Sequence, residues 1–143
     1  MNIYFVCTGN TCRSPMAEAI LKAKALPNVE VKSAGIYAMS GSGMSQGTRQ
    51  VLEEENMLIV HETSPLTEVD VKWADLILTM TRSHKEGVMN LYPFAADKVF
   101  SLKEYAEDVD GDVIDPYGGP LAEYRETFIE LSSLIEKLET KMH

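Results

Sequence analysis

The stretch from Cys7 to Pro15 combines a thiol, a guanidinium and several small hydroxyl or amide side chains, in the order Cys-Thr-Gly-Asn-Thr-Cys-Arg-Ser-Pro. A thiolate is a strong nucleophile, and a guanidinium can bind two phosphoryl oxygens at once. Arg13 follows Cys7 closely enough to fold back over the intervening loop. Ser14 can donate a hydrogen bond to the sulfur and make it a better leaving group. The stretch therefore predicts a loop that binds phosphate and attacks phosphorus with Cys7.

The residues on either side of this loop predict how it is held. Residues 3–6 are an apolar run typical of a buried strand, and Pro15 suits the first turn of a helix with Ser14 at its N-cap. Backbone N–H groups and a helix dipole at such a junction favour an anion and the thiolate form of Cys7. We expect Gly9 to allow the sharp turn and Asn10 to hold the loop's shape with its amide. An anion site is therefore expected at the end of the first strand.

The attack on phosphorus also needs a proton for the leaving group. Asp115 is the best candidate for this acid, because it lies in a loop, Asp-Pro-Tyr-Gly-Gly-Pro, that prolines would stiffen over the pocket. Other residues are predicted to surround the bound substrate. They are Thr8, Gly9, Asn10, Thr11, Cys12, Ser14 and Tyr117.

Apolar patterns along the rest of the chain alternate between strand and helix. We predict strands at 29–33, 76–80 and 98–102, a short buried run at 57–60, helices at 16–26, 46–56, 67–73, 82–90 and from 120 onward, and loops at 36–44 and 104–115. Thr67 is expected to cap the third of these helices. Seven apolar residues give the last helix a stripe with a period of 3.6, namely Leu121, Tyr124, Phe128, Leu131, Leu134, Ile135 and Leu138.

This alternation indicates an α/β fold of the doubly wound class. We predict one domain over residues 1–143, with a four-stranded parallel sheet in the flavodoxin-like order 2-1-3-4 and helices on both faces. Ligands of such sheets bind beyond the carboxyl ends of the strands. Cys7 lies at that end of the first strand.

The composition limits the partners. The 143 residues carry a formal net charge of −9, which disfavours binding of nucleic acid or anionic lipid through a broad basic face. The two cysteines lie in one loop and cannot form a disulfide framework, and His61, His84 and His143 match no zinc spacing, so we predict no structural metal and treat the histidines as ordinary polar residues. Without a signal or a membrane-spanning run, a cytoplasmic location is expected. The oligomeric state stays open.

Four motifs in this order resemble the low-molecular-weight protein tyrosine phosphatases over nearly the whole chain. They are Cys7-x5-Arg13-Ser14, Ser33-Ala34-Gly35, the run at 74–80 and Asp115-Pro116. The resemblance implies that Cys7 forms a phosphocysteine, that Arg13 binds phosphate, and that Asp115 acts first as acid and then as base. It also implies phosphorylated proteins as substrates and no metal or other cofactor.

Two features differ from the tyrosine-directed pattern of this family. Thr11 replaces the usual isoleucine, and Tyr117 is followed by Gly118-Gly119 instead of a second aromatic residue. In both features the chain resembles the bacterial protein-arginine phosphatase branch of the family. The hydroxyl of Thr11 suits a polar phosphoguanidinium better than a phenol, and the acidic loop before Asp115 would favour a cationic substrate arm. We therefore expect phosphoarginine as the substrate, with phosphotyrosine as the alternative.

Three further alternatives have to be weighed. Cys7 alone would be read as a buried structural thiol, but Arg13, Ser14 and Asp115 argue against this. Arsenate reductases share the fold and a similar loop but need further resolving cysteines, and this chain has only Cys7 and Cys12. A phosphate carrier without catalytic activity would not need an acid at Asp115. For Cys12, packing and the trapping of an oxidised Cys7 as a disulfide remain equal alternatives.

Overall fold

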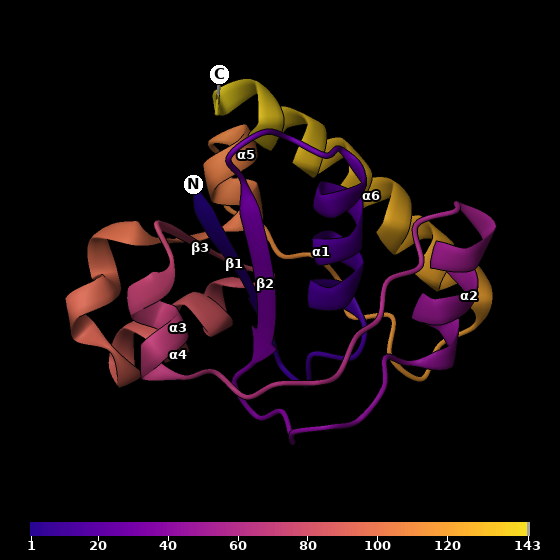
Figure 1. The fold of residues 1–143 in the computed structure, drawn as a ribbon, viewed down its shortest axis with the longest axis horizontal. Helices are drawn as coiled ribbons and strands as arrows, with labels where there is room; N and C mark the ends of the chain where they lie inside the picture. Colours follow the sequence, from indigo (N-terminus) through magenta and orange to yellow (C-terminus); the bar gives the residue numbers. More distant parts are fainter. Residues whose placement is uncertain (143) are drawn as a thin grey trace.

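A four-stranded sheet lies between two groups of helices in the computed structural model, which describes residues 1–142 (Figure 1). The strands are β1 (Asn2–Cys7), β2 (Glu30–Gly35), β3 (Leu76–Thr79) and β4 (Val99–Ser101). The helices are α1 (Arg13–Ala23), α2 (Gln46–Glu54), α3 (Glu68–Trp73), α4 (Arg82–Leu91), α5 (Leu102–Glu107) and α6 (Leu121–Lys141), with a short 3-10 helix at Pro93–Lys98.

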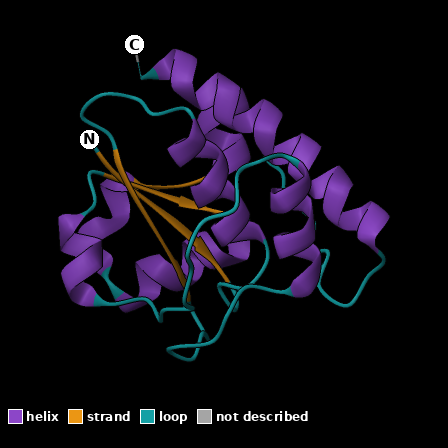
Figure 2. Cartoon of the chain, turned by 45° about the vertical axis from the view of Figure 1, so that its right-hand side comes forward, coloured by secondary structure: helices purple, strands orange, loops and turns teal. Residues whose placement is uncertain are grey.

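All strand pairs in the sheet are parallel, and the strand order is β2-β1-β3-β4. The predicted fold class and order are confirmed. Cys7 pairs with Gly35, and Val6 pairs with Thr79, so the carboxyl ends of the three neighbouring strands lie together. Loops gather at this end of the sheet, at the bottom of Figure 2.

The strand β1 is buried on both faces, which explains its continuous apolar sequence. Its alternate side chains enter two separate cores. Ile3 and Phe5 pack into a core with α1, α2, α5 and α6, whereas Tyr4 and Val6 pack into a smaller core with α3 and α4. Figure 1 shows α1, α2 and α6 on one side of the sheet and α3 and α4 on the other. Cys7 is thereby fixed at the end of a strand that is buried on both faces.

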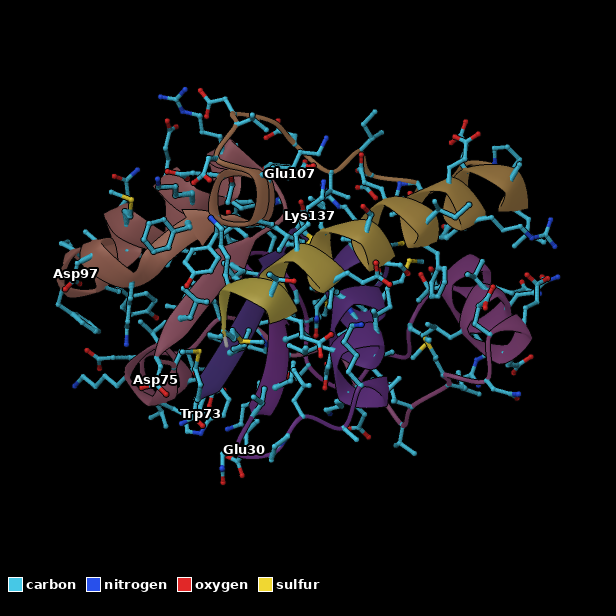
Figure 3. The ribbon with its side chains drawn as sticks, turned by 90° about the horizontal axis from the view of Figure 1, so that it is seen from above. Glu30, Trp73, Asp75, Asp97, Glu107 and Lys137 are labelled. Carbon is cyan, nitrogen blue, oxygen red and sulfur yellow. The ribbon has the colours of Figure 1, made fainter. Side chains whose placement is uncertain are left out.

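The long helix α6 closes the larger core with the predicted stripe. Six of the seven residues of this stripe are buried, and Leu121 packs at the margin of the core. A salt bridge between Lys137 of α6 and Glu107 of α5 ties the two helices together at the surface (Figure 3). Thr67 caps α3 as predicted, because its hydroxyl accepts a hydrogen bond of 3.2 Å from the N–H of Asp70.

Several predicted elements are wrong or misplaced. The predicted buried run at 57–60 is wrong, because Leu58 and Val60 are exposed and only Met57 and Ile59 pack at the margin of the larger core. This segment belongs to no strand, and the chain leads over the carboxyl ends of the strands, where the next few residues contact the Cys7 loop. The predicted loop at 104–115 begins as α5, whose start is a capping box formed by Ser101 and Glu104. The helix α1 ends at Ala23, because Ala25 adopts a left-handed φ of 49°.

Candidate active site

A pocket of about 280 Å³ opens at the carboxyl end of β1. Its walls come from the loop after β1 and from the segment before α6. The lining residues are Cys7, Thr8, Gly9, Thr11, Cys12, Arg13, Asp115 and Tyr117. The three residues predicted to do chemistry, Cys7, Arg13 and Asp115, therefore lie in one cavity. Asn10 and Ser14 were predicted to contact the substrate, and the structure places both behind the loop with no exposed surface.

The carbonyl groups of the loop are bonded outward, away from the pocket. Four of them accept hydrogen bonds from segments that pass outside the loop. The bonds are Ile36 N to Cys7 O (2.9 Å), Tyr37 N to Thr8 O (2.9 Å), Ser45 N to Thr11 O (2.9 Å) and His61 Nε2 to Asn10 O (2.8 Å). Since the N–H and C=O of a peptide unit point in opposite directions, this arrangement leaves loop N–H groups on the inner side, where an anion binds. The N–H of Asn10, for example, donates to Cys7 Sγ at 3.3 Å.

Asn10 holds the loop in shape with every polar group of its side chain. Its Nδ2 donates to Ser14 Oγ at 2.8 Å and to Ser33 Oγ at 3.0 Å, and its Oδ1 accepts from the N–H of Ser64 at 2.9 Å. Its φ of 58° is left-handed, a conformation that asparagine tolerates well. The sharp turn assigned to Gly9 is therefore made by Asn10, and Gly9 has no left-handed φ.

Gly35, at the end of β2, is the glycine that the loop requires. A Cβ atom at this position would lie 2.5 Å from Thr8 O and 2.7 Å from Asn10 N, closer than any side chain can approach. The two strand ends can therefore meet only because residue 35 has no side chain. The glycine of the Ser33-Ala34-Gly35 motif thus has a specific steric cause.

Ser14 does not cap α1, contrary to the prediction. The helix begins at Arg13, and its N-cap position is Cys12, which makes no side-chain cap. The oxygen of Ser14 accepts from Asn10 and lies 2.8 Å from Cys7 Sγ, against 3.4 Å from the carbonyl of Ala34. The hydroxyl of Ser14 therefore donates its proton to the sulfur, the nearer acceptor. In this position Ser14 can stabilise a thiolate. Contact with Cys7 replaces the capping bond.

Arg13 is buried beside the pocket and is held from the opposite side of the site. Its Nη1 donates to the carbonyl of Val113 at 2.9 Å, and its Nη2 lies 3.5 Å from Asp115 Oδ2. Val113 in turn donates its N–H to Met80 O at the end of β3, at 2.9 Å. Val113 therefore links the acidic segment, Arg13 and the sheet, a role that its sequence context does not signal.

Asp115 reaches the pocket in a turn that its own side chain stabilises. Its Oδ1 accepts the N–H of Tyr117 at 3.0 Å, and the N–H of Gly119 donates to Pro116 O at 2.9 Å. Gly118 has a φ of 79°, as the third position of this turn requires. The side chain of Asp115 remains 46% exposed, so the carboxylate faces both Arg13 and the pocket opening.

Cys12, the other thiol of the loop, donates to Ser45 Oγ at 3.2 Å and lies 3.8 Å from Tyr124 OH. These are packing contacts between the loop, α2 and α6, and burial raises the pKa of Tyr124. Both cysteines are free thiols. The structure thus supports packing for Cys12 without testing the disulfide alternative.

Two histidines that the sequence indicated only as polar residues belong to the site's support. His61 Nε2 bonds to the carbonyl of Asn10, and its Nδ1 lies 3.8 Å from Glu18, which also accepts from Ser33 Oγ. His84 Nε2 lies 2.8 Å from Thr8 Oγ1. No local pattern signals either contact, because the partners are 51 and 76 residues away. His143 lies outside the described residues.

Burial of His84 predicts a specific acid sensitivity. Burial, followed by repulsion from Arg13, lowers the pKa of His84 to about 4, and Asp112 and Asp115 oppose this shift. Between pH about 6.5 and 4, the unfolded chain carries a proton on this residue that the folded chain lacks. Unfolding therefore takes up a proton. As the pH is lowered from 6.5 to 4, the free energy of unfolding decreases by up to about 3 kcal/mol. Urea unfolding of wild type and His84→Gln at pH 7 and 4.5 measures the effect. Wild type should lose more of its free energy of unfolding between these pH values than the variant, and equal losses in the two proteins would contradict the prediction.

Residues 1–142 contain neither a metal-binding cluster nor a helix that could span a membrane. No group of three or more histidine, cysteine or acidic side chains is arranged to hold a metal ion. No helix in this part of the chain is long and apolar enough to cross a membrane.

This chain is similar to known proteins over nearly its whole length. Residues 2–143 match the family described as low molecular weight phosphotyrosine protein phosphatase. A protein-arginine-phosphatase of Geobacillus stearothermophilus is 47% identical over 140 residues, which cover 98% of this chain and 95% of that protein. The low molecular weight protein-tyrosine-phosphatase PtpB of Staphylococcus aureus is 45% identical over 139 residues, which cover 97% of each chain.

Solved structures agree with these relationships. The YwlE arginine phosphatase from Geobacillus stearothermophilus superposes with a TM-score of 0.97 at 47% identity, over 99% of this chain and 92% of that one. A C7S mutant of a YwlE arginine phosphatase, described as having a phosphorylated active-site serine, superposes with a TM-score of 0.96 at 42% identity, over 99% of this chain and 95% of that one.

Proposed function

The chain belongs to the low molecular weight phosphotyrosine protein phosphatase family, and from this premise we propose that it removes phosphate from phosphoarginine in proteins. The observation that carries the proposal is the single pocket that holds Cys7, Arg13 and Asp115, with Thr11 in its wall. The substrates would be phosphorylated proteins of the cytoplasm. The proposed reaction uses side chains of this chain alone.

In the first step, the sulfur of Cys7 attacks phosphorus. A sulfur–phosphorus bond forms while the phosphorus–nitrogen bond of phosphoarginine breaks, and protonated Asp115 gives its proton to the departing guanidino nitrogen. Inward-facing N–H groups and Arg13 would hold the phosphoryl oxygens and stabilise the charge of the transition state. Arg13 is already buried and fixed by Val113, so little reorganisation is needed.

In the second step, water hydrolyses the phosphocysteine. Asp115, now a carboxylate, takes a proton from the water. The water oxygen attacks phosphorus, and the sulfur–phosphorus bond breaks. The thiolate of Cys7 leaves with a hydrogen bond from Ser14, whose oxygen lies 2.8 Å from the sulfur. The phosphorylated active-site serine of the C7S relative supports transfer of phosphate to this position.

The preference for arginine is supported by the wall and rim of the pocket. Thr11 places a hydroxyl in the wall, and after Tyr117 the turn continues with two glycines. Among residues 1–142, Tyr117 is thus the one aromatic residue that lines this pocket. The carboxylate of Asp115 would face the cationic guanidinium of the leaving group. Two relatives named as arginine phosphatases superpose on this chain with TM-scores of 0.97 and 0.96, at 47% and 42% identity.

Phosphotyrosine is the second candidate substrate, and the observation that favours it is the similarity to PtpB, which is named a protein-tyrosine-phosphatase at 45% identity. The same chemistry would apply to both substrates, with a phenol instead of a guanidinium as the leaving group. The two proposals therefore differ only in the leaving group and in the pocket residues that contact it.

The substrate preference is tested with phosphoarginine and phosphotyrosine placed in the same peptide. Wild type is expected to have the higher kcat/KM for phosphoarginine. Thr11→Ile should move the ratio of the two kcat/KM values toward phosphotyrosine by about 10-fold or more, because it replaces a polar wall contact with an apolar one. Wild type that prefers phosphotyrosine, with no change of ratio in the variant, would overturn the arginine assignment.

A further inference from the structure

The hydroxyl of Thr8 lies between two buried nitrogen groups and the open pocket. Its Oγ1 is 2.8 Å from His84 Nε2 and 3.5 Å from Arg13 Nη2. Thr8 itself is exposed and lines the pocket, whereas His84 and Arg13 are buried. One side of this hydroxyl is therefore fixed by the protein, and the other faces the space where substrate binds.

The surroundings of His84 determine which ring nitrogen carries the proton. A neutral imidazole has one N–H donor and one acceptor nitrogen. Within residues 1–142, the Nδ1 of His84 is buried and has no hydrogen-bond partner. A buried N–H group without an acceptor is rarer and more costly than an unfilled lone pair. The proton therefore belongs on Nε2, which donates it to Thr8 Oγ1.

This assignment also directs the hydroxyl proton of Thr8. With His84 and Arg13 both donating, the oxygen has used its two lone pairs. The described part of the chain offers this hydroxyl no acceptor of its own, since its two partners are both donors. The proton is left to point into the pocket, toward whatever acceptor binds there. A tetrahedral oxyanion bound over Cys7 presents such an acceptor.

We propose that Thr8 donates a hydrogen bond to a phosphoryl oxygen of the substrate, and that His84 is the positioning residue that orients this donor. The inference rests on the proposed function, because it assigns a further contact for the same phosphoryl group. It adds a neutral donor of fixed direction to the loop N–H groups and Arg13. It also gives Arg13 Nη2 a second oxygen neighbour besides Asp115, which keeps the guanidinium in the pocket wall.

Binding of inorganic phosphate to the intact protein tests the contact by titration calorimetry. Thr8→Val, which keeps the shape but removes the hydroxyl, is expected to weaken phosphate binding by about 10-fold or more. Thr8→Ser should retain most of the affinity. His84→Leu should weaken binding less than Thr8→Val, and His84→Gln should restore it, because the glutamine amide can place an N–H where Nε2–H lies.

The double variant Thr8→Val/His84→Leu separates positioning from a general structural effect. If His84 acts through Thr8, the double variant binds phosphate no more weakly than Thr8→Val alone. Additive losses would overturn the positioning role, and unchanged affinity in Thr8→Val would overturn the contact. Wild type that binds phosphate but does not hydrolyse phosphoarginine would contradict the proposed substrate, while the Thr8 results would still stand.

The tautomer of His84 can be read without any substitution. Nitrogen-15 NMR of the imidazole at pH 7 is expected to show a neutral ring with its proton on Nε2. A proton on Nδ1 alone would overturn the proposal, because Nε2 would then be an acceptor and would draw the hydroxyl proton of Thr8 away from the pocket.

Discussion

Replacing Cys7 with serine is expected to lower turnover by about 10⁴-fold or more while leaving the pocket intact. The sulfur accepts hydrogen bonds from the N–H of Asn10 and from Ser14, an environment that stabilises negative charge. A serine hydroxyl at this position stays protonated at neutral pH, and Asp115, the proposed acid, is assigned to the leaving group. The change replaces one sulfur atom with oxygen, so it removes the thiolate nucleophile and alters the packing little.

Two measurements distinguish loss of the nucleophile from loss of structure. The Cys7→Ser protein should retain its unfolding temperature within a few degrees and still bind inorganic phosphate. Cys12→Ser is the matched control, since Cys12 is the other buried thiol of the loop but contacts Ser45 and Tyr124. We expect this control to keep most of its activity. If Cys7→Ser retained more than about 1% of the wild-type turnover, the nucleophile would have to be sought elsewhere.

Replacing Asp115 with asparagine is expected to reduce kcat by about 10²- to 10⁴-fold on a substrate with a basic leaving group. The amide cannot supply a proton, but its oxygen can still accept the N–H of Tyr117, so the turn keeps its shape. The loss of the ion pair with Arg13 should cost little stability, because the carboxylate is half exposed and 3.5 Å away. Catalysis should therefore suffer far more than folding.

The dependence on the leaving group provides the sharper measurement. Aryl phosphates with phenols of increasing acidity need less protonation, so the gap between wild type and Asp115→Asn should shrink along the series. Asp110→Asn is a suitable control, since this exposed carboxylate pairs with Arg82 outside the pocket. Unchanged turnover in Asp115→Asn would remove the acid role. Wild type without turnover of any phosphate ester would favour the phosphate-carrier alternative.

Local patterns predicted most of the frame. The apolar run of β1, the stripe of α6 and the cap at Thr67 all depend on neighbours within a few residues, and all three are confirmed. The predictions failed where a distant part of the chain competed with the local pattern. Residues 57–60 are apolar but lead into the contacts of His61 and Ser64 with the Cys7 loop, so they are only half buried. Ser14 contacts the sulfur of Cys7 instead of capping α1.

The sequence by itself determined which groups the Cys7 loop contains and that a strand and a helix flank it, because these features depend on adjacent residues. The tertiary structure decided what holds and completes the loop. Val113 reaches Arg13 across 100 residues, and His84 reaches Thr8 across 76, contacts that exist only once the parallel strands bring their carboxyl ends together. The same approach of strand ends makes Gly35 obligatory and brings Asp115 to the pocket. No spacing along the chain encodes these distances.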